Sequence, residues 1–314
     1  MCIRDSYKTT DGGVTWKRVL YKDDNTGASD LAMDPRDPNL LYAAMYQRQR
    51  KGWGFNGGGP SSGIYRTIDG GATWTELVNG LPPGDKGRIG LATAGDSRTV
   101  YAVVEADPAD HPSGGVFRSQ NRGETWEHLS NLDPRPMYYS RIYLDPKDAN
   151  RVYVMGSNRG LWTSDDAGRS FREVFSNVHG EDHTMWIDPD NPNRLLIGGD
   201  GGVSISYDRG LSWLFRLNLP IGQFYNIAVN NREPYLICGG LQDNGNWCTP
   251  SASKMAYGIS FQDAFNVGGG DGMQAVFEGD DHTLLVSSQN GVTARLDLDN
   301  MERQTCLLYT SRCV

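Results

Sequence analysis

The sequence predicts an all-β fold, a β-propeller of four-stranded antiparallel blades, from three observations. An eight-residue phrase of the form Ser/Thr-x-Asp-x-Gly-x-Thr/Ser-Trp recurs every 42 to 58 residues, which is the period of propeller blades rather than of helical repeats. Short apolar runs alternate with Pro, Asp and Asn turns along the chain. The 39 glycines among 314 residues suit the many tight turns of such a fold. We therefore expect about six to seven visible blades, as part of a larger propeller.

The repeated phrase is expected to form a structural turn in each blade. Its acidic third position can accept hydrogen bonds from turn N–H groups, its glycine can adopt a positive φ, and its aromatic ring can anchor the outgoing strand by becoming buried. The copies span Thr9–Trp16, Thr67–Trp74, Ser119–Trp126, Ser164–Phe171 and Ser206–Trp213, with Asp11, Asp69, Asn121, Asp166 and Asp208 at the third position. We predict that these five residues hold the fold and take no part in catalysis.

A second repeat is expected to form the first hairpin of each blade. It consists of an apolar strand, an Asp-Pro turn and another apolar strand, as in Leu31–Tyr42, Ile142–Tyr153 and Trp186–Leu196. Because blades share one ring, we predict a single domain over residues 7–305. Its blades are expected near residues 7–20 (partial), 28–80, 86–130, 138–176, 182–217, 222–266 (without a recognisable copy of the phrase) and 271–300 (partial).

The two ends, residues 1–6 and 306–314, are expected to be adapter-derived rather than native. Both can be back-translated into one short DNA string read on opposite strands, and this string resembles a transposon-end sequencing adapter. The chain is thus expected to be a metagenomic fragment whose full blade number, signal segment and further domains lie outside it.

Composition narrows the range of partners. The formal net charge is −8 and no basic stripe is present, which argues against a nucleic-acid partner. No apolar run approaches the length of a membrane-spanning helix. Cys238 and Cys248 flank a turn-like segment, so a disulfide across this loop and two free thiols are both open at this point.

The order of strands in a blade separates two faces of the propeller. The repeated phrases and the Asp-Pro turns share one face, and the remaining loops lie on the other. Those loops are rich in glycine, carboxylate, amide, histidine and aromatic groups, the kind of polar and aromatic groups that line concave ligand sites. Turn chemistry alone accounts for any single loop, but not as readily for several on one face. The candidate binding residues on this face are Tyr139, Arg141, His179, Asp182, His183, Asp200, Gln223, Tyr225, Gln242, Asp243, Asn244, Trp247, Asp271 and Gln289.

The repeated phrase resembles the Asp-box, or BNR, repeat of sialidases, xyloglucanases and sortilin-type receptors, in which it is a fold element. The segments 179–189, 239–245, 268–272 and 288–291 are similar to those of large bacterial sortilin-like Asp-box proteins, which are often labelled glycosyl hydrolases on fold grounds alone. The resemblance covers nearly all of residues 7–300. It implies a secreted, periplasmic or cell-surface protein whose loop face binds a peptide, a protein or a glycan.

A glycoside hydrolase acting on polysaccharide is the alternative. Its chemistry needs two carboxyl groups that face a sugar. Resemblance to sialidases is weak, since Arg88-Ile89 lacks the expected proline, and the xyloglucanase phrase survives only as a loose echo at residues 63–66. The aspartates that could supply a catalytic pair are Asp182, Asp200, Asp243 and Asp271.

Metal binding is a third possibility, based on His179 and His183, which flank two acidic residues. This segment precedes a strand, so the two imidazoles do not share a helix face, and ordinary loop histidines are the preferred interpretation. We therefore predict no metal and no cofactor. The favoured prediction is an exported recognition module, with hydrolysis as the alternative.

Overall fold

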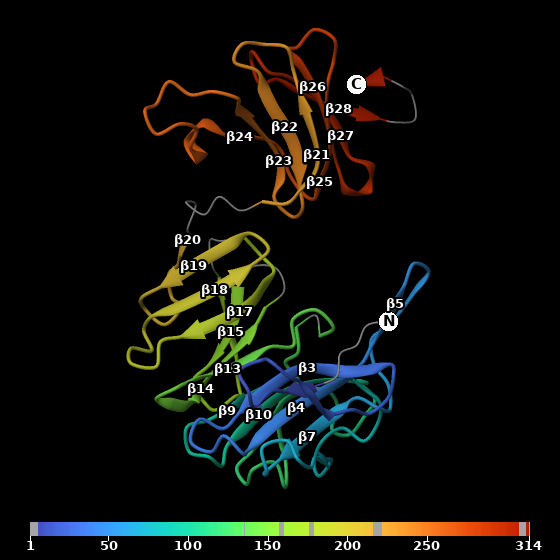
Figure 1. Cartoon of the computed structure of the whole chain (residues 1–314), viewed down its shortest axis with the longest axis vertical. Coiled ribbons are helices and arrows are strands. Elements are labelled where there is room, and N and C mark those ends of the chain that lie inside the picture. The colour runs from blue at the N-terminus through green and yellow to red at the C-terminus, as the bar shows by residue number, and fades with distance from the viewer. Residues whose placement is uncertain are drawn as a thin grey trace. The chain divides into compact units, whose positions relative to one another are not determined.

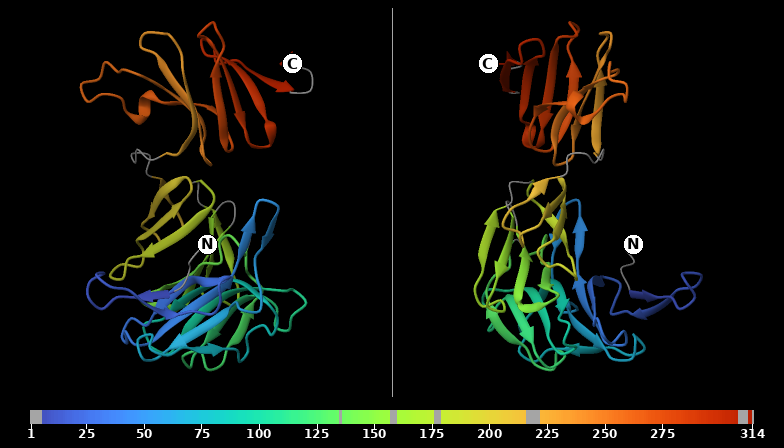
Figure 2. Two further views of the ribbon diagram at one scale, coloured as in Figure 1. Left: turned by 45° about the vertical axis from the view of Figure 1, so that its right-hand side comes forward. Right: turned by 90° about the vertical axis from the view of Figure 1, so that its left-hand side faces the viewer.

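The computed structural model describes residues 6–134, 136–156, 160–175, 179–215, 222–307 and 312–313 (Figures 1 and 2). These residues form β-strands and loops with two short 3₁₀ turns and no α-helix. Contacts divide the chain into two compact units. Unit 1 comprises Met1–Gly199 and Val203–Phe215, and unit 2 comprises Asp200–Gly202 and Arg216–Val314.

Unit 1 contains a two-stranded partial blade followed by four blades of four antiparallel strands each. Blade I consists of β1 (Ser6–Lys8) and β2 (Lys17–Leu20). Blade II consists of β3 (Thr26–Met33), β4 (Leu41–Gln47), β7 (Gly63–Thr67) and β8 (Thr75–Leu77), and the separate hairpin of β5 (Gln49–Lys51) and β6 (Gly54–Asn56) extends from its β4–β7 connection. Blade III consists of β9 (Lys86–Thr93), β10 (Val100–Ala106), β11 (Gly115–Ser119) and β12 (Glu127–Ser130). Blade IV consists of β13 (Ile142–Asp145), β14 (Asp148–Met155), β15 (Gly160–Ser164) and β16 (Arg172–Phe175), and blade V of β17 (Asp182–Ile187), β18 (Leu195–Gly199), β19 (Gly202–Ser206) and β20 (Leu214–Phe215).

Unit 2 contains two blades, VI and VII, joined in the same order. Blade VI consists of β21 (Phe224–Val229), β22 (Leu236–Leu241), β23 (Gly245–Pro250) and β24 (Phe265–Gly268), with the 3₁₀ turn η1 (Phe261–Asp263) before its last strand. Blade VII consists of β25 (Gly272–Phe277), β26 (Thr283–Ser288), β27 (Thr293–Asp297) and β28 (Arg303–Leu307), with η2 (Gln289–Gly291) after its second strand and β29 (Arg312–Cys313) at its edge. The predicted all-β fold of four-stranded antiparallel propeller blades is confirmed.

The second strands of blades II and III are buried on both faces because these two blades stack face to face. In β4 and β10 the buried residues are continuous rather than alternating. Side chains of blades II and III meet in one core that includes Tyr42, Ile64, Ile89 and Phe117. Burial of large apolar side chains at this density is the main stabilising contribution to unit 1.

The repeated phrase folds as the sequence predicts. In blade II, Thr67 Oγ1 accepts the Gly71 N–H at 2.9 Å, and the Asp69 carboxylate accepts the N–H and the hydroxyl of Thr73 at 2.9 and 2.6 Å. The hydrogen bonds from Thr73 lower the pKa of Asp69 well below its ordinary value. In the copy with an amide, Asn121 Oδ1 accepts the Thr125 N–H and its Nδ2 donates to the Thr125 hydroxyl, so Asn reproduces the same turn without a charge.

In blades II and IV the repeated phrase also contacts the first hairpin of its own blade. The Gly70 N–H donates to the Asn39 carbonyl at 3.0 Å in blade II, and the Ala167 N–H donates to the Asn150 carbonyl at 2.9 Å in blade IV. Boxes and first turns of these blades therefore share one face, as expected from the strand order.

The aromatic residue of the box is buried only where a neighbouring strand covers it. Trp126 of blade III is 6% exposed, whereas Trp16 of blade I is 60% exposed. The expectation that every copy buries its ring is therefore wrong for Trp16, because blade I contributes only two strands around it.

Blade VI has no Asp box and is held differently. Cys238 of β22 and Cys248 of β23 are directly opposed, 4.1 Å apart between Cα atoms, and form a disulfide. Both are buried in the core that blade VI shares with Val286 and Leu296 of blade VII. An inserted segment, residues 251–264, takes the place of the box turn between β23 and β24. The open question between a disulfide and two thiols is thus resolved in favour of the disulfide.

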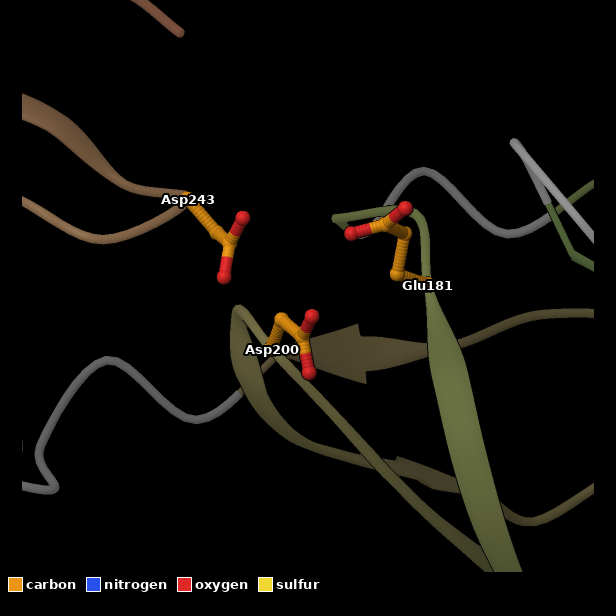
Figure 3. Close-up of side chains that lie close together, drawn as sticks. All are labelled: Glu181, Asp200 and Asp243. Carbon is orange, nitrogen blue, oxygen red and sulfur yellow. The ribbon is translucent and has the colours of Figure 1, made fainter. Parts of the chain in front are cut away.

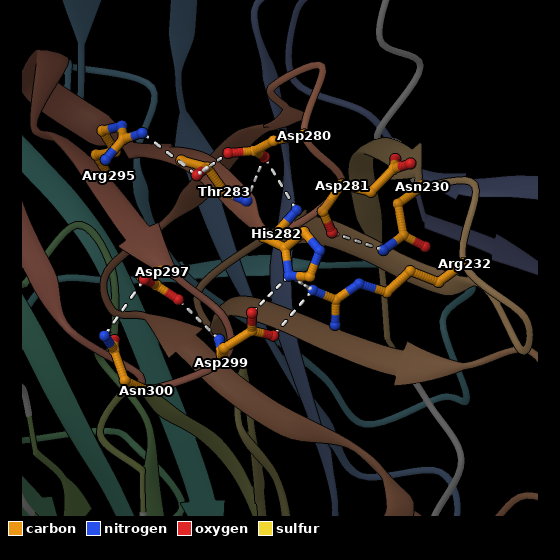
Figure 4. A network of polar contacts seen from close by, with 10 residues as sticks. All are labelled: Asn230, Arg232, Asp280, Asp281, His282, Thr283, Arg295, Asp297, Asp299 and Asn300. Carbon is orange, nitrogen blue, oxygen red and sulfur yellow. Dashed lines mark hydrogen bonds and ion pairs between the residues drawn. The ribbon is translucent and has the colours of Figure 1, made fainter.

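Polar side chains join the turns of blades VI and VII (Figure 4). The Arg232 guanidinium donates to Asp299 at 3.0 Å, and His282 Nδ1 lies 2.5 Å from the same carboxylate. The Asn230 amide donates to the Asp281 carbonyl at 3.1 Å. The hydrogen bond from Arg232, followed by that from His282, lowers the pKa of Asp299. This network fixes the face of unit 2 opposite the loops described next.

No helix among the described residues has the length and apolar character needed to cross a membrane.

Candidate functional site

Two loops of unit 2 meet at the start of the inner strands of blades VI and VII. One loop, residues 242–244, joins β22 to β23, and the other, residues 269–271, joins β24 to β25. The Asp243 N–H donates to Asp271 Oδ1 at 2.8 Å, and the Gly245 N–H donates to the Gly270 carbonyl at 2.8 Å. These bonds lock the two loops together.

Five more candidate residues belong to this pair of loops or contact it through backbone and amide hydrogen bonds. The Gln242 N–H donates to the Gln223 carbonyl at 3.0 Å, and the Gln289 N–H donates to the Asp271 carbonyl at 3.0 Å. The Asn244 side-chain amide donates to the Asp200 carbonyl at 2.9 Å. Unit 2 thereby brings together, from five separate segments, the candidates Asp200, Gln223, Gln242, Asp243, Asn244, Asp271 and Gln289, which we call the loop cluster.

Two carboxylates of the loop cluster approach each other closely. A carboxylate oxygen of Asp200 lies within 4.8 Å of one of Asp243, and both residues are half-buried. Figure 3 shows the side chains of Asp200 and Asp243 at the tips of their loops. Asp243 holds a positive φ of 60°, a conformation that Asp tolerates better than most residues and that turns its side chain out of the strand direction.

The glycine-rich phrases around the loop cluster are needed for the close approach of two blades. A Cβ at Gly240 would lie 2.2 Å from the Gly272 carbonyl carbon, and a Cβ at Gly272 would lie 2.2 Å from the Gly245 carbonyl oxygen. Only glycine permits these contacts between backbones. The ladders of β21 and β25 also shift register beside the cluster, between Phe224 and Asn226 and between Gly272 and Ala275. Such bulges redirect side chains at the ends of strands.

Aromatic side chains lie beside the carboxylates. The Trp247 indole donates to the Asn244 carbonyl at 2.7 Å, and its ring lies 5.4 Å from that of Phe261 in the insertion of blade VI. Phe224 and Tyr225 are exposed. Partial burial, and then the carboxylates of Asp271 and Asp243, raise the pKa of the Tyr225 phenol. The carboxylates and amides of the loop cluster thus lie beside aromatic rings, and together these are the groups that bind sugar hydroxyls and sugar faces.

The candidates in unit 1 are placed differently. Tyr139 is fully buried and stacks on His183 with ring centroids 5.4 Å apart, and Asp182 is 5% exposed. Both side chains lie in the interior of the unit, and their assignment as ligand-contacting residues stays a prediction. The order of strands in a blade had placed Pro136–Arg141 among the loops that enter a blade on the loop face.

The other unit 1 candidates make local contacts. Arg141 forms an ion pair with Asp30 of β3 at 2.8 Å, which ties blade IV to blade II. His179 Nδ1 lies 2.7 Å from the Gly180 carbonyl. Among the described residues, neither His179 nor His183 belongs to a group of three side chains arranged to hold a metal ion.

A buried polar group in unit 1 escaped the sequence analysis. Burial, and then the neighbouring Glu105, raise the pKa of Asp133 to about 8, and the Ser140 hydroxyl donates to its Oδ1 at 3.3 Å. Burial also raises the pKa of Glu105, which accepts the Arg88 N–H at 2.8 Å. Perturbed carboxyl groups often mark functional sites. Here one oxygen of Asp133, Oδ2, is shielded from solvent, although the residue as a whole is half-buried. Asn131-Leu132-Asp133-Pro134 resembles an ordinary turn, and nothing in it signals burial.

Comparison with known proteins supports the family resemblance. The family described as Sortilin, neurotensin receptor 3, matches residues 114–241, which include blade IV, blade V and the first half of blade VI. The predicted resemblance to sortilin-like Asp-box propellers is therefore confirmed over this part of the chain.

Curated relatives are xyloglucanases. A probable oligoxyloglucan-reducing end-specific xyloglucanase of Neosartorya fischeri is 28% identical over 178 residues, covering 55% of this chain and 20% of the relative. Xyloglucanase Xgh74A of Acetivibrio thermocellus is 27% identical over 229 residues, covering 58% of this chain and 27% of the relative. A xyloglucanase of Hypocrea jecorina is 24% identical over 209 residues, covering 62% of this chain and 23% of the relative. The chain thus spans about a quarter or less of the length of these relatives.

Solved structures with a similar arrangement include the GH74 xyloglucanase of Xanthomonas campestris, with a TM-score of 0.47, 17% identity and coverage of 96% of this chain and 47% of that one. YCF48 bound to D1 peptide has a TM-score of 0.44 and 16% identity, with coverage of 92% and 84%.

Proposed function

We propose that this chain is part of an exported glycoside hydrolase that cleaves a polysaccharide of the xyloglucan type. The observation that carries the proposal is the similarity to xyloglucanases over more than half of the chain, at 24 to 28% identity. This similarity favours hydrolysis over the recognition module that the motifs alone suggested. The Cys238–Cys248 disulfide supports export, because disulfides persist in oxidising compartments.

Within the described residues, the loop cluster is the place best suited to this chemistry. Hydrolysis of a glycosidic bond requires one carboxyl group to protonate the leaving oxygen while a carboxylate acts at the anomeric carbon, directly or through a water. The C1–O bond breaks, water supplies the new hydroxyl, and its proton restores the acid. Asp200 and Asp243 supply two carboxyl groups at close range, and Asp271 holds the loop of Asp243 through its N–H.

The neighbouring side chains suit a sugar ligand. The exposed rings of Phe224 and Tyr225 offer flat apolar surface against which a pyranose can lie, and the amides of Gln242 and Asn244 offer donors and acceptors for hydroxyls. A polysaccharide, unlike a small molecule, needs such groups spread along a surface rather than enclosed in a cavity.

Release of reducing sugar from xyloglucan tests the proposal. We expect the full chain to hydrolyse xyloglucan, and Asp200→Asn and Asp243→Asn each to lower the rate on the order of 10²- to 10⁴-fold by removing a proton-transfer group. Asp85→Asn, at an exposed aspartate of unit 1, is the matched control and should retain the wild-type rate. Wild-type rates in both loop variants would contradict the assignment of this carboxyl pair.

A non-catalytic recognition module is the second candidate, favoured by the sortilin-type match over residues 114–241. It would bind a peptide, a protein or a glycan through the same loop face. Binding of xyloglucan oligosaccharides without cleavage, measured by calorimetry on the same preparations, would support this second function and reject the first.

A further inference from the structure

One projecting element of unit 1 has no part in the proposed hydrolysis. The β5–β6 hairpin leaves blade II between β4 and β7 and extends away from the body of its unit, as the views of Figures 1 and 2 show. Its two strands pair with each other as Gln49 with Asn56, Arg50 with Phe55 and Lys51 with Gly54. Gly52 and Trp53 form the tight turn at the tip.

The base of the hairpin is fixed while its tip is free. The Arg48 N–H donates to the Asn25 carbonyl at 3.3 Å, and the Gln49 side chain donates to Asn25 Oδ1 at 2.6 Å. The Gln47 N–H donates to the Ser62 hydroxyl at 2.9 Å. From residue 50 to residue 56 every side chain is exposed. The hairpin is therefore held at a defined place but contributes little to the core.

The tip presents an aromatic ring to solvent. Trp53 is 87% exposed, the most exposed large hydrophobic side chain among the described residues. Lys51 Nζ lies 5.9 Å from the Trp53 ring centroid, and the Arg48 guanidinium lies 5.5 Å from that of Phe55. Each cation lies within cation–π distance of its ring, and both rings remain exposed to solvent. Exposed aromatic groups that do not serve the core are typical of interaction surfaces.

The tip of the hairpin is positively charged, whereas the protein as a whole carries a negative net charge. No Asp or Glu occurs between Asp37 and Asp69, whereas Arg48, Arg50 and Lys51 lie within four residues, in a chain of net charge −8. At physiological ionic strength charges separated by more than about 8 Å are largely screened, so this local positive group governs what the tip attracts.

Stacking surface and positive charge together define the chemistry of a partner. An indole face packs against the apolar face of a pyranose ring, and cations beside it pair with carboxylates carried on the same ring. The exposed Asn56 on β6 adds an amide for sugar hydroxyls. A membrane would require a larger continuous apolar face than one indole and one phenyl ring supply.

We infer that the β5–β6 hairpin is a second, non-catalytic binding element that holds an anionic, uronate-containing polysaccharide through Trp53, Arg50 and Lys51. It anchors the protein on an acidic matrix polymer, a function separate from cleavage at the loop cluster.

Binding of the full chain to polygalacturonate, measured by calorimetry at several salt concentrations, tests this inference. We expect Trp53→Ala to weaken binding about tenfold, equivalent to about 1.4 kcal/mol of lost stacking. The double variant Arg50→Gln/Lys51→Gln should weaken binding and flatten its salt dependence. The matched controls Tyr257→Ala and Lys254→Gln, at exposed positions in the insertion of blade VI, should bind as wild type does.

Three results would overturn the inference: no binding of polygalacturonate by the wild type, unchanged binding by Trp53→Ala, or equal loss of binding in the unit 2 controls. Neutral xyloglucan and vesicles of phosphatidylcholine with phosphatidylserine are the comparison ligands, and dependence on Trp53 for either of these in place of polygalacturonate would likewise reject an acidic glycan. Xyloglucan cleavage is scored separately, so an inactive chain that binds polygalacturonate through Trp53 would reject only the proposed hydrolase.

Discussion

Unit 1 and unit 2 are built from the same kind of blade, yet they order their outer turns by different means. In unit 1 each of the five outer turns is an Asp box in which one carboxylate or amide collects the hydrogen bonds of the turn. In the described part of unit 2 neither blade has a box, and a disulfide and an arginine–carboxylate network take its place. The comparison teaches that the box is one of several ways to fix this turn. Unit 1 uses its carboxyl groups for structure, whereas unit 2 gathers three of them at loop tips.

The largest predicted effect concerns the buried carboxyl of Asp133 in unit 1. Its folded pKa of about 8 lies above the ordinary 3.8, so the folded state keeps a proton that the unfolded state releases. The free energy of unfolding should therefore fall as pH rises from about 4 to 8, by at most about 1.4 kcal/mol per pH unit for this group. Asp133→Asn cannot titrate and should lose this slope in denaturant titrations. Parallel pH profiles for the variant and the wild type would contradict the assignment, and Asp85→Asn controls for removal of a negative charge.

Removal of the disulfide tests how blade VI of unit 2 is stabilised without an Asp box. The double variant Cys238→Ala/Cys248→Ala opens a loop whose ends are 10 residues apart, so we expect a loss of about 2 to 3 kcal/mol of stability. Hydrogen exchange followed by mass spectrometry should show faster exchange in β22 and β23 and unchanged exchange in blades II to IV. Equal acceleration in both units would show that the cross-link has no local role. Wild-type protein treated with reductant under denaturing conditions and then refolded serves as the thiol control.

Thr67 and Thr249 allow a direct comparison between a blade that has an Asp box and a blade that lacks one. Thr67 ends the third strand of blade II and accepts the buried Gly71 N–H, whereas Thr249 lies near the end of the third strand of blade VI with its buried hydroxyl unpartnered among the described residues. Thr67→Val leaves a buried donor unsatisfied and should cost about 1 to 2 kcal/mol. Thr249→Val removes an unsatisfied hydroxyl and should be neutral or slightly stabilising. Thermal denaturation checks both, and equal losses would remove the distinction between the two turns.

The smallest effect is expected in acid. Hydrogen bonds from Thr15 and Ser170, respectively, lower the pKa values of Asp11 and Asp166 to about 2. Because the pKa values are lower in the folded state, the ionised carboxylates stabilise the fold above the ordinary pKa near 4, and this contribution is lost as the pH falls toward 2. Tryptophan fluorescence between pH 5 and 2 should report loosening of the box turns. Asp166→Asn should give blade IV the uncharged form of the turn that Asn121 already forms in blade III, so that this turn no longer responds to acid. An unchanged acid transition in this variant would count against a role for the carboxylate.

Local pattern predicted the blades well because each hairpin is encoded within about ten residues. The boxes, the Asp-Pro turns and the proximity of Asp200, Asp243 and Asp271 all follow from strand order, since loops on one face of adjacent blades must meet. Burial of Tyr139 and Asp182 and the perturbed Asp133 did not follow, because they depend on how irregular loops fold over the core. The relationship to xyloglucanases was also underestimated, since it was judged on one short phrase at residues 63–66 while the similarity is spread over more than half of the chain.

The covalent link inside blade VI has a practical corollary for the segment that follows it. Because the disulfide fixes β22 against β23, the connection from β23 to β24 does not have to hold the blade together and can carry extra sequence, in which Lys254 and Tyr257 are exposed. Lys254 and Tyr257 are therefore suitable positions at which to attach a fluorophore or an affinity tag without disturbing the loop cluster or the β5–β6 hairpin.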